Sequence, residues 1–556
     1  MTAPPAPAPA GPPSTLRSAG VVGFMTLLSK ITGMLQTRLV ANLLGAGVAA
    51  DAFFVAFRIP NLLRRFTAEG TMTSAFLPTL GEVEAERGPA AAQEMVAKFL
   101  GTLTVFLTLL CALAIPAMGL IVGLQVLGRL APQASPWQQL AVLRDILLGQ
   151  RATPVELVLT TTLARIMFPY LILVSLTAGL AAVLNRRGIF GLPASASTVW
   201  NLVFIAFGYG CFTWGPPAWR VPERAALILA VGTVVGGIGS LLLLWPTFKR
   251  LGFGLRWGFF FRHPGVGTAF RRMAPGILGT GIHPINVLIS TMLASQLAVG
   301  AQTVLFNANM MSEMVLGIFG ASIATVSLPA MSRLVEAKDF AGLRTSLASA
   351  LRGTAVMAIP GAVGLAVLSL PIIALLLQTG RYGASAVEWT AHTLVFQAVG
   401  ILFIATSRIA TQCLYALREY TWPAGAALVG MVANVILSIV LMRWLGTGGI
   451  ALANGLASLV TLGLIAARLQ TRLGRLPFRA VLGGWTSMGL AAAAMGLVAW
   501  AGGRWLTVEV FRGVLGSSLR LLPLIAGSAL VYGGLLWLFR VPEARHIWGV
   551  IRRKRE

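Results

Sequence analysis

Long apolar stretches separated by short polar connections dominate the chain from about residue 16 to about residue 539. Most of these stretches approach or exceed roughly 20 residues, the length that a helix needs to cross the hydrocarbon core of a bilayer. The alternating ten-residue strands of a membrane barrel do not occur, so the pattern predicts an all-α polytopic membrane protein with fourteen transmembrane helices. The expected spans lie near residues 16–44, 51–80, 98–124, 156–184, 194–213, 225–247, 274–298, 303–331, 354–377, 388–416, 423–442, 449–467, 480–502 and 521–539.

The composition supports this interpretation. Of the 556 residues, 56% are hydrophobic and 11% are charged, whereas roughly 25% are charged in an ordinary soluble protein. A soluble globular enzyme, a disordered chain and a disulfide scaffold are therefore excluded. Residues 1–14 are rich in Pro and Ala and are expected to form a disordered tail.

No motif predicts a cofactor. The three cysteines are isolated and show no metal-ligand spacing, and no phosphate-binding loop of a nucleotide-driven pump is present. The sequence predicts neither a cofactor nor a metal centre, and no enzymatic activity. Transport would then depend on an ion gradient or on the membrane potential.

The net charge of +26 arises from 43 basic and 17 acidic residues. In a membrane protein, most of this excess is expected to be a topology signal rather than a nucleic-acid footprint. With the N-terminus inside, 25 basic residues fall in inside connections and 10 in outside ones. Both termini are therefore predicted to be cytoplasmic, with residues 541–556 as a basic tail. The inside connection 82–97 is an exception, because it gathers four glutamates.

The connection 248–272 is the longest on the inside and mixes aromatic with basic residues, a composition typical of a segment lying in the headgroup layer. It separates the first six spans from the rest. Residues 184–201 and 417–434 share a faint pattern at an offset of about 230 residues. Taken alone, this similarity is explained equally well by chance and by a six-span repeat. Such a repeat would place a substrate site between the two halves.

The second expected span carries the most informative polar residues. Arg58, Arg64 and Arg65 lie within eight residues, and Glu69 lies four positions after Arg65, close enough to pair with it on a helix. The span also contains Pro60, which predicts a broken helix that exposes backbone groups toward a cavity. Arginines that reach the inner-leaflet headgroups would be the alternative. The favoured interpretation is a cationic vestibule for a phosphate-bearing ligand.

Other polar residues in the spans extend this hypothesis. Glu313 is an isolated acid that is expected to have a partner from the first or second span, although a neutral hydrogen-bonded glutamate would also fit. Asn434 and Ser438 are weak candidates for a cation site and are better explained as interhelical hydrogen-bonding residues. The predicted substrate-binding residues are Lys30, Arg38, Asp51, Arg58, Arg64, Arg65, Glu69 and Glu313.

Several local motifs resemble those of one family of membrane transporters. They are residues 44–47 (LGAG), 51–65 (DAFFVAFRIPNLLRR), 68–70 (AEG), 75–78 (AFLP), 168–170 (FPY), 275–279 (PGILG), 328–329 (LP) and 378–382 (QTGRY). This pattern resembles the MurJ (MviN) family of lipid II flippases, which belongs to the multidrug/oligosaccharidyl-lipid/polysaccharide exporter superfamily. The resemblance covers about residues 18–470 and, more loosely, the last two spans.

The resemblance implies two pseudo-symmetric six-helix lobes around a cationic cavity, plus two extra C-terminal helices. The expected segments are an N-lobe at 15–247, an interfacial linker at 248–272, a C-lobe at 273–470 and spans 13 and 14 at 471–540. It also implies a flippase that moves a polyprenyl-diphosphate glycan, lipid II, from the inner to the outer leaflet by alternating access. The implied setting is the bacterial inner membrane, where membrane lipids and cell-wall synthesis proteins are the expected partners.

Two departures from the family pattern leave alternatives open. The family's Arg-Asp pair in the first span is Gln36-Thr37 here, and its Asp-Arg pair in the eighth span is Asn309-Met310. A diphosphate needs cationic donors, so a flippase for a different polyprenyl-linked glycan and a non-transporting membrane scaffold for envelope assembly remain alternatives. A drug antiporter of the same superfamily fits less well, because its cavity should be acidic.

Overall fold

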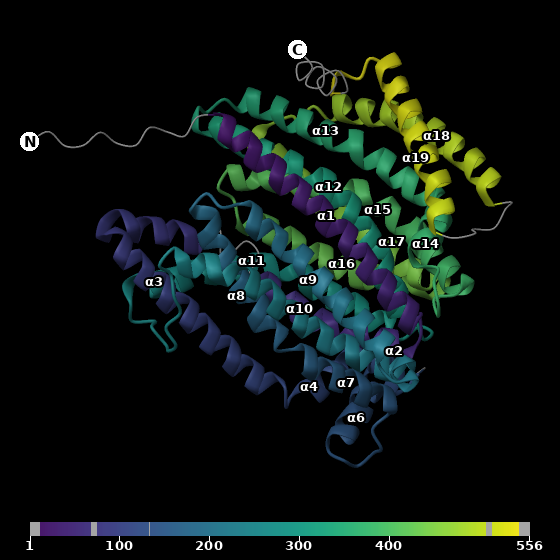
Figure 1. Ribbon diagram of the computed structural model, residues 1–556. Helices are drawn as coiled ribbons and strands as arrows, with labels where there is room; N and C mark the ends of the chain where they lie inside the picture. Colours follow the sequence, from purple (N-terminus) through teal and green to yellow (C-terminus); the bar gives the residue numbers. More distant parts are fainter. Residues whose placement is uncertain (1–11, 68–74, 133, 508–513, 544–556) are drawn as a thin grey trace, which may run out of the picture. The chain divides into compact units, whose positions relative to one another are not determined.

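The protein is almost entirely helical. The computed structural model describes residues 12–67, 75–132, 134–507 and 514–543, with the backbone alone at 12–19, 65–67, 274–281, 283, 318–326, 505–507 and 514–519. Over these residues the single β pairing is an isolated bridge between Thr379 and Tyr382. The helices, shown in Figure 1, are α1 (Pro12–Leu44), α2 (Val48–Thr67), α3 (Leu77–Ala114), α4 (Met118–Gln125), α5 (Leu127–Leu130), α6 (Pro136–Leu147), α7 (Val155–Met167), α8 (Tyr170–Arg186), α9 (Gly191–Trp214), η2 (Pro217–Arg220), α10 (Pro222–Arg250), α11 (Pro264–Ala294), α12 (Ala301–Glu336), α13 (Phe340–Val367), α14 (Ser369–Leu377), α15 (Ala384–Ala416), α16 (Thr421–Leu445), α17 (Thr447–Leu473), α18 (Phe478–Thr507) and α19 (Val514–Leu538).

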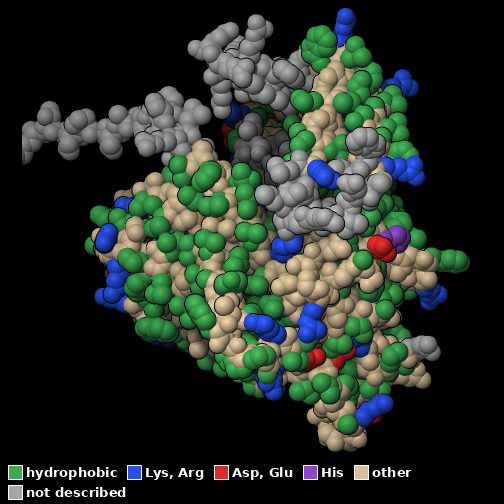
Figure 2. All heavy atoms as spheres, turned by 45° about the vertical axis from the view of Figure 1, so that its right-hand side comes forward, with side chains coloured by type: hydrophobic (Ala, Val, Ile, Leu, Met, Phe, Trp, Pro, Cys, Tyr) green, Lys and Arg blue, Asp and Glu red, His purple; other side chains and the backbone are tan. Residues whose placement is uncertain are grey.

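The prediction of an all-α polytopic membrane protein is confirmed. In the described part of the chain, ten helical segments are long and apolar enough to cross a membrane. Four further helices, α1, α2, α11 and α12, are 20 to 36 residues long and coincide with the first, second, seventh and eighth expected spans. The count of fourteen spans stays a prediction. On the face drawn in Figure 2, hydrophobic side chains are widely exposed and few acidic side chains are visible, as lipid contact requires.

The chain divides into two compact units. Unit 1 comprises Met1–Leu44, Val55–Val122 and Thr153–Thr280, and unit 2 comprises Gly45–Phe54, Gly123–Ala152 and Gly281–Glu556. The lobe boundaries expected from the sequence stay a prediction.

In unit 1, α10 packs against α7, α8 and α9, while α1 packs against α9 and α3 against α8. An aromatic stack connects these helices: Phe57 and Tyr170 both lie against Trp200, with ring centroids 6.0 and 5.7 Å away. Asn201 of α9 donates its amide to the Ser29 carbonyl and to the Thr32 hydroxyl of α1, both at 3.0 Å. Large rings and satisfied polar groups therefore hold the helices of this unit together.

Two local expectations about unit 1 need correction. Helix α2 continues through Pro60 instead of breaking there, since a membrane helix tolerates the loss of one backbone hydrogen bond. The acidic connection 82–97 is not a loop, because α3 runs through it with a kink at Gly88. Its glutamates pair with basic residues of other predicted inside segments: Arg272 with Glu82, and both Arg186 and Arg187 with Glu84. These ion pairs explain how acidic residues are accommodated among basic inside connections.

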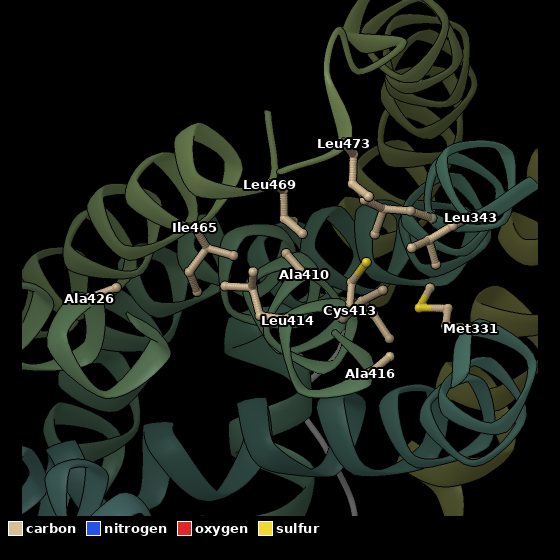
Figure 3. Packing of buried hydrophobic residues seen from close by; sticks show 12 residues of the cluster. Met331, Leu343, Ala410, Cys413, Leu414, Ala416, Ala426, Ile465, Leu469 and Leu473 are labelled. Atoms are coloured by element: carbon tan, nitrogen blue, oxygen red, sulfur yellow. The ribbon is translucent and has the colours of Figure 1, made fainter. Parts of the chain in front are cut away.

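In unit 2, α15 packs against α12, α13, α14 and α17 and thus forms the centre of the bundle, while α16 packs on α17, α18 on α13, and α19 on α18. Figure 3 shows a buried apolar cluster of this unit, in which Met331 of α12 and Leu343 of α13 lie on the side of Cys413 of α15, while Leu414 lies toward α17. Ile465, Leu469 and Leu473 of α17 complete the cluster. These side chains are at most 5% exposed, so this apolar core holds four helices together.

Glycines permit the closest approach between α15 and α17. A Cβ atom added at Gly400 would lie 2.6 Å from the Cα of Gly455, and one added at Gly455 would lie 2.6 Å from the Cα of Gly400. Backbone atoms cannot rotate away as a flexible side chain can. Small residues at this crossing are therefore needed for the helices to pack, as is common in membrane interiors.

We expect Gly400→Ala to destabilise the protein by about 1–3 kcal/mol, because the added methyl group overpacks the α15–α17 contact. The measurement is thermal unfolding of the purified protein in detergent. Gly463→Ala in α17 is the matched control, since nothing lies within 4 Å of a Cβ atom there. The control should be neutral or stabilising by up to about 1 kcal/mol. Equal transition temperatures for the two variants would contradict the packing argument.

Candidate functional site

The predicted cationic residues of the first two spans lie in unit 1. Lys30 and Arg38 lie on α1 and are half-buried, Arg58 on α2 is 6% exposed, and Arg64 is half-buried. The side chain of Arg65 and the whole of Glu69 lie outside the described residues, so their predicted pairing stays a prediction. Four cationic side chains in an apolar unit, one of them deeply buried, are costly unless they have polar partners or a wet cavity.

Asp51 lies in unit 2 and is fully buried. Its carboxylate accepts hydrogen bonds from the backbone N–H groups of Gly300 and Thr303, both at 2.7 Å, and from the Thr303 hydroxyl. Gly300 is the N-cap of α12 and Thr303 lies in its first turn. Asp51 therefore caps α12 from another helix, where a carboxylate also interacts favourably with the helix dipole.

Arg129 completes the group around Asp51. It lies on the short helix α5, its side chain is 9% exposed, and its guanidinium forms an ion pair with the Asp51 carboxylate. Gly128 is fixed next to it, because its N–H donates to the Ser295 hydroxyl at 3.1 Å. Arg129 is one of the ten basic residues predicted in outside connections, and no motif indicated this role. A basic residue in an otherwise apolar segment was the available signal.

At Gly300, which precedes α12, and at Gly45, which precedes α2, the neighbouring backbone leaves no room for a side chain. Gly300 has a φ of 97°, and a Cβ atom there would lie 2.4 Å from the Ala46 carbonyl oxygen. Gly45, with a φ of 67°, is similarly tight against the Arg381 backbone, where a Cβ atom would lie 2.7 Å from the carbonyl oxygen. Both positions need glycine because they combine a left-handed backbone with close contact. Gly45 and Ala46, just before α2, therefore pack closely against the backbone of Arg381, before α15, and of Gly300, at the N-terminus of α12.

Glu313 has an ion-pair partner, although from an unexpected helix. Arg408 of α15 donates from Nη2 to its carboxylate at 3.2 Å, and the two side chains are 46% and 47% exposed. The structure thus pairs Glu313 with the tenth expected span, whereas the sequence reasoning looked to the first or second. Half-exposed groups retain unused hydrogen-bonding capacity, so the Arg408 guanidinium can also bind an anion.

Asn434 and Ser438 are buried in α16. The Asn434 amide donates to the Asn286 side chain at 2.8 Å and to the Ser290 hydroxyl at 3.3 Å, both on α11. These contacts fit the interhelical role favoured for Asn434. Within the described residues there is no group of three His, Cys, Asp or Glu side chains that could hold a metal.

Comparison with known proteins agrees with this architecture. The family model described as "Lipid II flippase MurJ" matches residues 40–523. A probable lipid II flippase MurJ of Vibrio cholerae is 30% identical over 452 residues, covering 81% of this chain and 82% of the relative. The lipid II flippase MurJ of Burkholderia cenocepacia is also 30% identical, over 458 residues, covering 81% and 83%.

Solved structures show the same fold. A lipid II flippase MurJ in an inward closed conformation superposes with a TM-score of 0.70 and 21% identity, covering 93% of this chain and 98% of the other. An inward-facing multidrug transporter of the MATE family gives a TM-score of 0.61 at 12% identity, covering 82% and 98%. Because the family model spans most of the chain, the protein belongs to the MurJ family of lipid II flippases.

Proposed function

We propose that this protein moves lipid II, or a closely related polyprenyl-diphosphate glycan, from the inner to the outer leaflet of the bacterial inner membrane. Family membership supports this function. The observation that carries it is the presence of Lys30, Arg38, Arg58 and Arg64 within an apolar helical unit. A diphosphate is anionic, and guanidinium groups are its best side-chain partners.

Two of the predicted acidic residues have arginine partners of their own in unit 2. Asp51 forms its ion pair with Arg129 and caps α12, and Glu313 pairs with Arg408. Among the described residues, Asp51 and Glu313 are therefore each accompanied by an arginine of the same unit. Arg408 is a further cation that an arriving phosphate can share with Glu313. We infer that Arg408, which lies next to α12, supplies a positive charge in place of the arginine that the family has where this chain has Met310.

Alternating access would then carry the headgroup across while α18 and α19 accompany the lipid tail. Both termini would lie in the cytoplasm, in agreement with the distribution of basic residues. The energy would come from an ion gradient or the membrane potential, since no reaction is catalysed. Cell-wall synthesis proteins would be partners that consume the exported precursor.

The second candidate is a non-transporting scaffold in an envelope-assembly complex. The residues that favour it are Gln36-Thr37 and Asn309-Met310, where the family has charged pairs. A scaffold would need the fold and its surfaces but no anion-binding residues.

Expression of this chain in a bacterium depleted of its own lipid II flippase separates the candidates. We expect growth to be restored and lipid II to become accessible in the outer leaflet, measured by labelling of the exposed headgroup. An empty vector is the negative control, and the host flippase is the positive control. Normal abundance of the chain in the membrane without lipid II export would contradict the proposed function.

A further inference from the structure

A pocket at one end of unit 2 is not part of the predicted transport site. It has a volume of about 540 Å³ and is lined by Arg418, Glu419, Tyr420, Thr421, Trp422, Arg468 and Arg472. These residues come from the connection between α15 and α16, the start of α16 and the end of α17. By the distribution of basic residues, all of these segments face the cytoplasm, which places the pocket at the level of the inner-leaflet headgroups.

Glu419 fixes the direction of two guanidinium groups. Arg468 donates to its carboxylate from Nε at 2.8 Å and from Nη2 at 3.1 Å, and Arg472 donates from Nε. The hydrogen bond from Arg468 holds the pKa of Glu419 below its ordinary value, and Arg472 adds to this effect. The Glu419 side chain is 14% exposed, whereas those of Arg468 and Arg472 are 31% and 53% exposed. The carboxylate is therefore at the back of the pocket, and both arginines keep N–H groups that can reach a ligand.

Aromatic residues complete the wall. The Arg468 guanidinium lies over the Trp422 ring, 5.5 Å from its centroid, and Tyr420 stacks on Tyr415 at 5.6 Å. Trp422 and Tyr420 are 41% and 63% exposed. Tryptophan and tyrosine are enriched where a membrane protein crosses the headgroup layer. Since a carboxylate and a ring hold Arg468 in place, little side-chain entropy is lost when it binds a ligand.

Arg418 adds a third cation with a left-handed backbone, at a φ of 61°. Lys338 and Arg540 have the same conformation after α12 and α19, where a basic residue interacts favourably with the helix C-terminus. That general role does not require a pocket. Arg418 differs from Lys338 and Arg540 because it lines a pocket together with Arg468 and Arg472. The pocket thus contains three guanidinium groups and one carboxylate.

We propose that this pocket binds the phosphate headgroup of an anionic phospholipid of the inner leaflet, such as phosphatidylglycerol. A phosphodiester can accept hydrogen bonds from the N–H groups of Arg468 and Arg472 that Glu419 leaves unused, and the neighbouring aromatic residues suit the glycerol and upper acyl region. The site lies on residues other than the predicted transport cations, so it does not depend on which glycan is transported.

The test is lipid binding to the purified full-length protein, measured by native mass spectrometry with phosphatidylglycerol and with phosphatidylcholine of the same acyl chains. We expect tighter binding of phosphatidylglycerol, and a loss of at least about tenfold in its affinity for the Arg468→Gln/Arg472→Gln variant, because two charge-assisted contacts are removed. Arg418→Gln leaves the Glu419 ion pairs intact and should weaken binding in the same direction. The control is Arg475→Gln, an exposed arginine that does not line the pocket, with an expected change below about twofold.

Two outcomes would overturn the proposal. The first is unchanged phosphatidylglycerol binding in folded Arg418→Gln and in the double variant, with folding checked by gel filtration. The second concerns the source of the phosphate, because an isoprenyl diphosphate offers similar chemistry. If undecaprenyl diphosphate binds the wild type more tightly than phosphatidylglycerol and the double variant loses the diphosphate selectively, the pocket serves the transported lipid instead.

Discussion

Asp51→Asn is expected to destabilise the protein by about 3–5 kcal/mol, the usual cost of removing one partner from a buried ion pair. The carboxylate is fully buried, pairs with Arg129 and accepts backbone N–H groups from Gly300 and Thr303. An asparagine has no charge to offer Arg129 and can present only one acceptor oxygen to α12. The measurement is the thermal unfolding transition in detergent, together with the abundance of the protein in the membrane.

Asp145→Asn is the matched control for Asp51→Asn. Asp145 pairs with Arg144 at 2.9 Å, and the two side chains are 33% and 68% exposed, so its loss should cost less than about 1 kcal/mol. A second variant separates charge from capping: Asp51→Asn combined with Arg129→Met should be less destabilised than the sum of the two single variants. Additive effects, or a transition temperature for Asp51→Asn that equals the control, would contradict the role assigned to this group.

The Asp51 group also shows what could be predicted from the sequence. Asp51 was a functional candidate because it begins the charged motif of residues 51–65 that resembles the MurJ family. Its partners could not be predicted, because they lie 78 to 252 positions away along the chain. Helix periodicity and composition carry information about neighbours in sequence. The contact of one helix with the N-terminus of another depends on packing that a single sequence does not reveal.

The apolar spans could be predicted because they depend on residues that are neighbours in sequence. The hydrophobic thickness of the membrane sets the length of each apolar stretch, so within the described residues the expected spans coincide with helices. Local chemistry was less reliable: Pro60 suggested a break that α2 does not contain, and residues 82–97 were expected to be an inside connection, whereas α3 continues through them. A membrane helix tolerates the backbone hydrogen bond that Pro60 removes, and Arg186, Arg187 and Arg272 pair with the glutamates of α3.

Glu313 illustrates the same limit at the predicted transport site. The sequence indicated that this carboxylate needs a cationic or amide partner, and the structure supplies Arg408 at 3.2 Å. Arg408 comes from the tenth expected span, and the expected partner from the first or second span stays a prediction. The pairing shows that Arg408 stays beside α12, near the positions where the family's arginine is replaced by Met310.

Arg408→Gln is expected to reduce export of the lipid-linked precursor by at least about tenfold, since a charge-assisted hydrogen bond to a phosphate contributes roughly 1.5–3 kcal/mol. Stability should change by less than about 1 kcal/mol, because both members of the Glu313–Arg408 pair are half-exposed. Export is measured in a strain that depends on this protein, by labelling lipid II in the outer leaflet, with membrane abundance determined in parallel.

Glu313→Gln distinguishes an anion-binding arginine from a structural ion pair. It breaks the same pair but leaves the Arg408 guanidinium charged and more available to a phosphate, so export should be retained. Arg443→Gln, at an exposed arginine near the end of α16, controls for the loss of one positive charge and should export normally. If Glu313→Gln and Arg408→Gln lose export equally with equal losses of abundance, the pair only supports the helices. If both export normally, Arg408 does not replace the arginine missing at Met310, and anion binding would depend on the cations of unit 1.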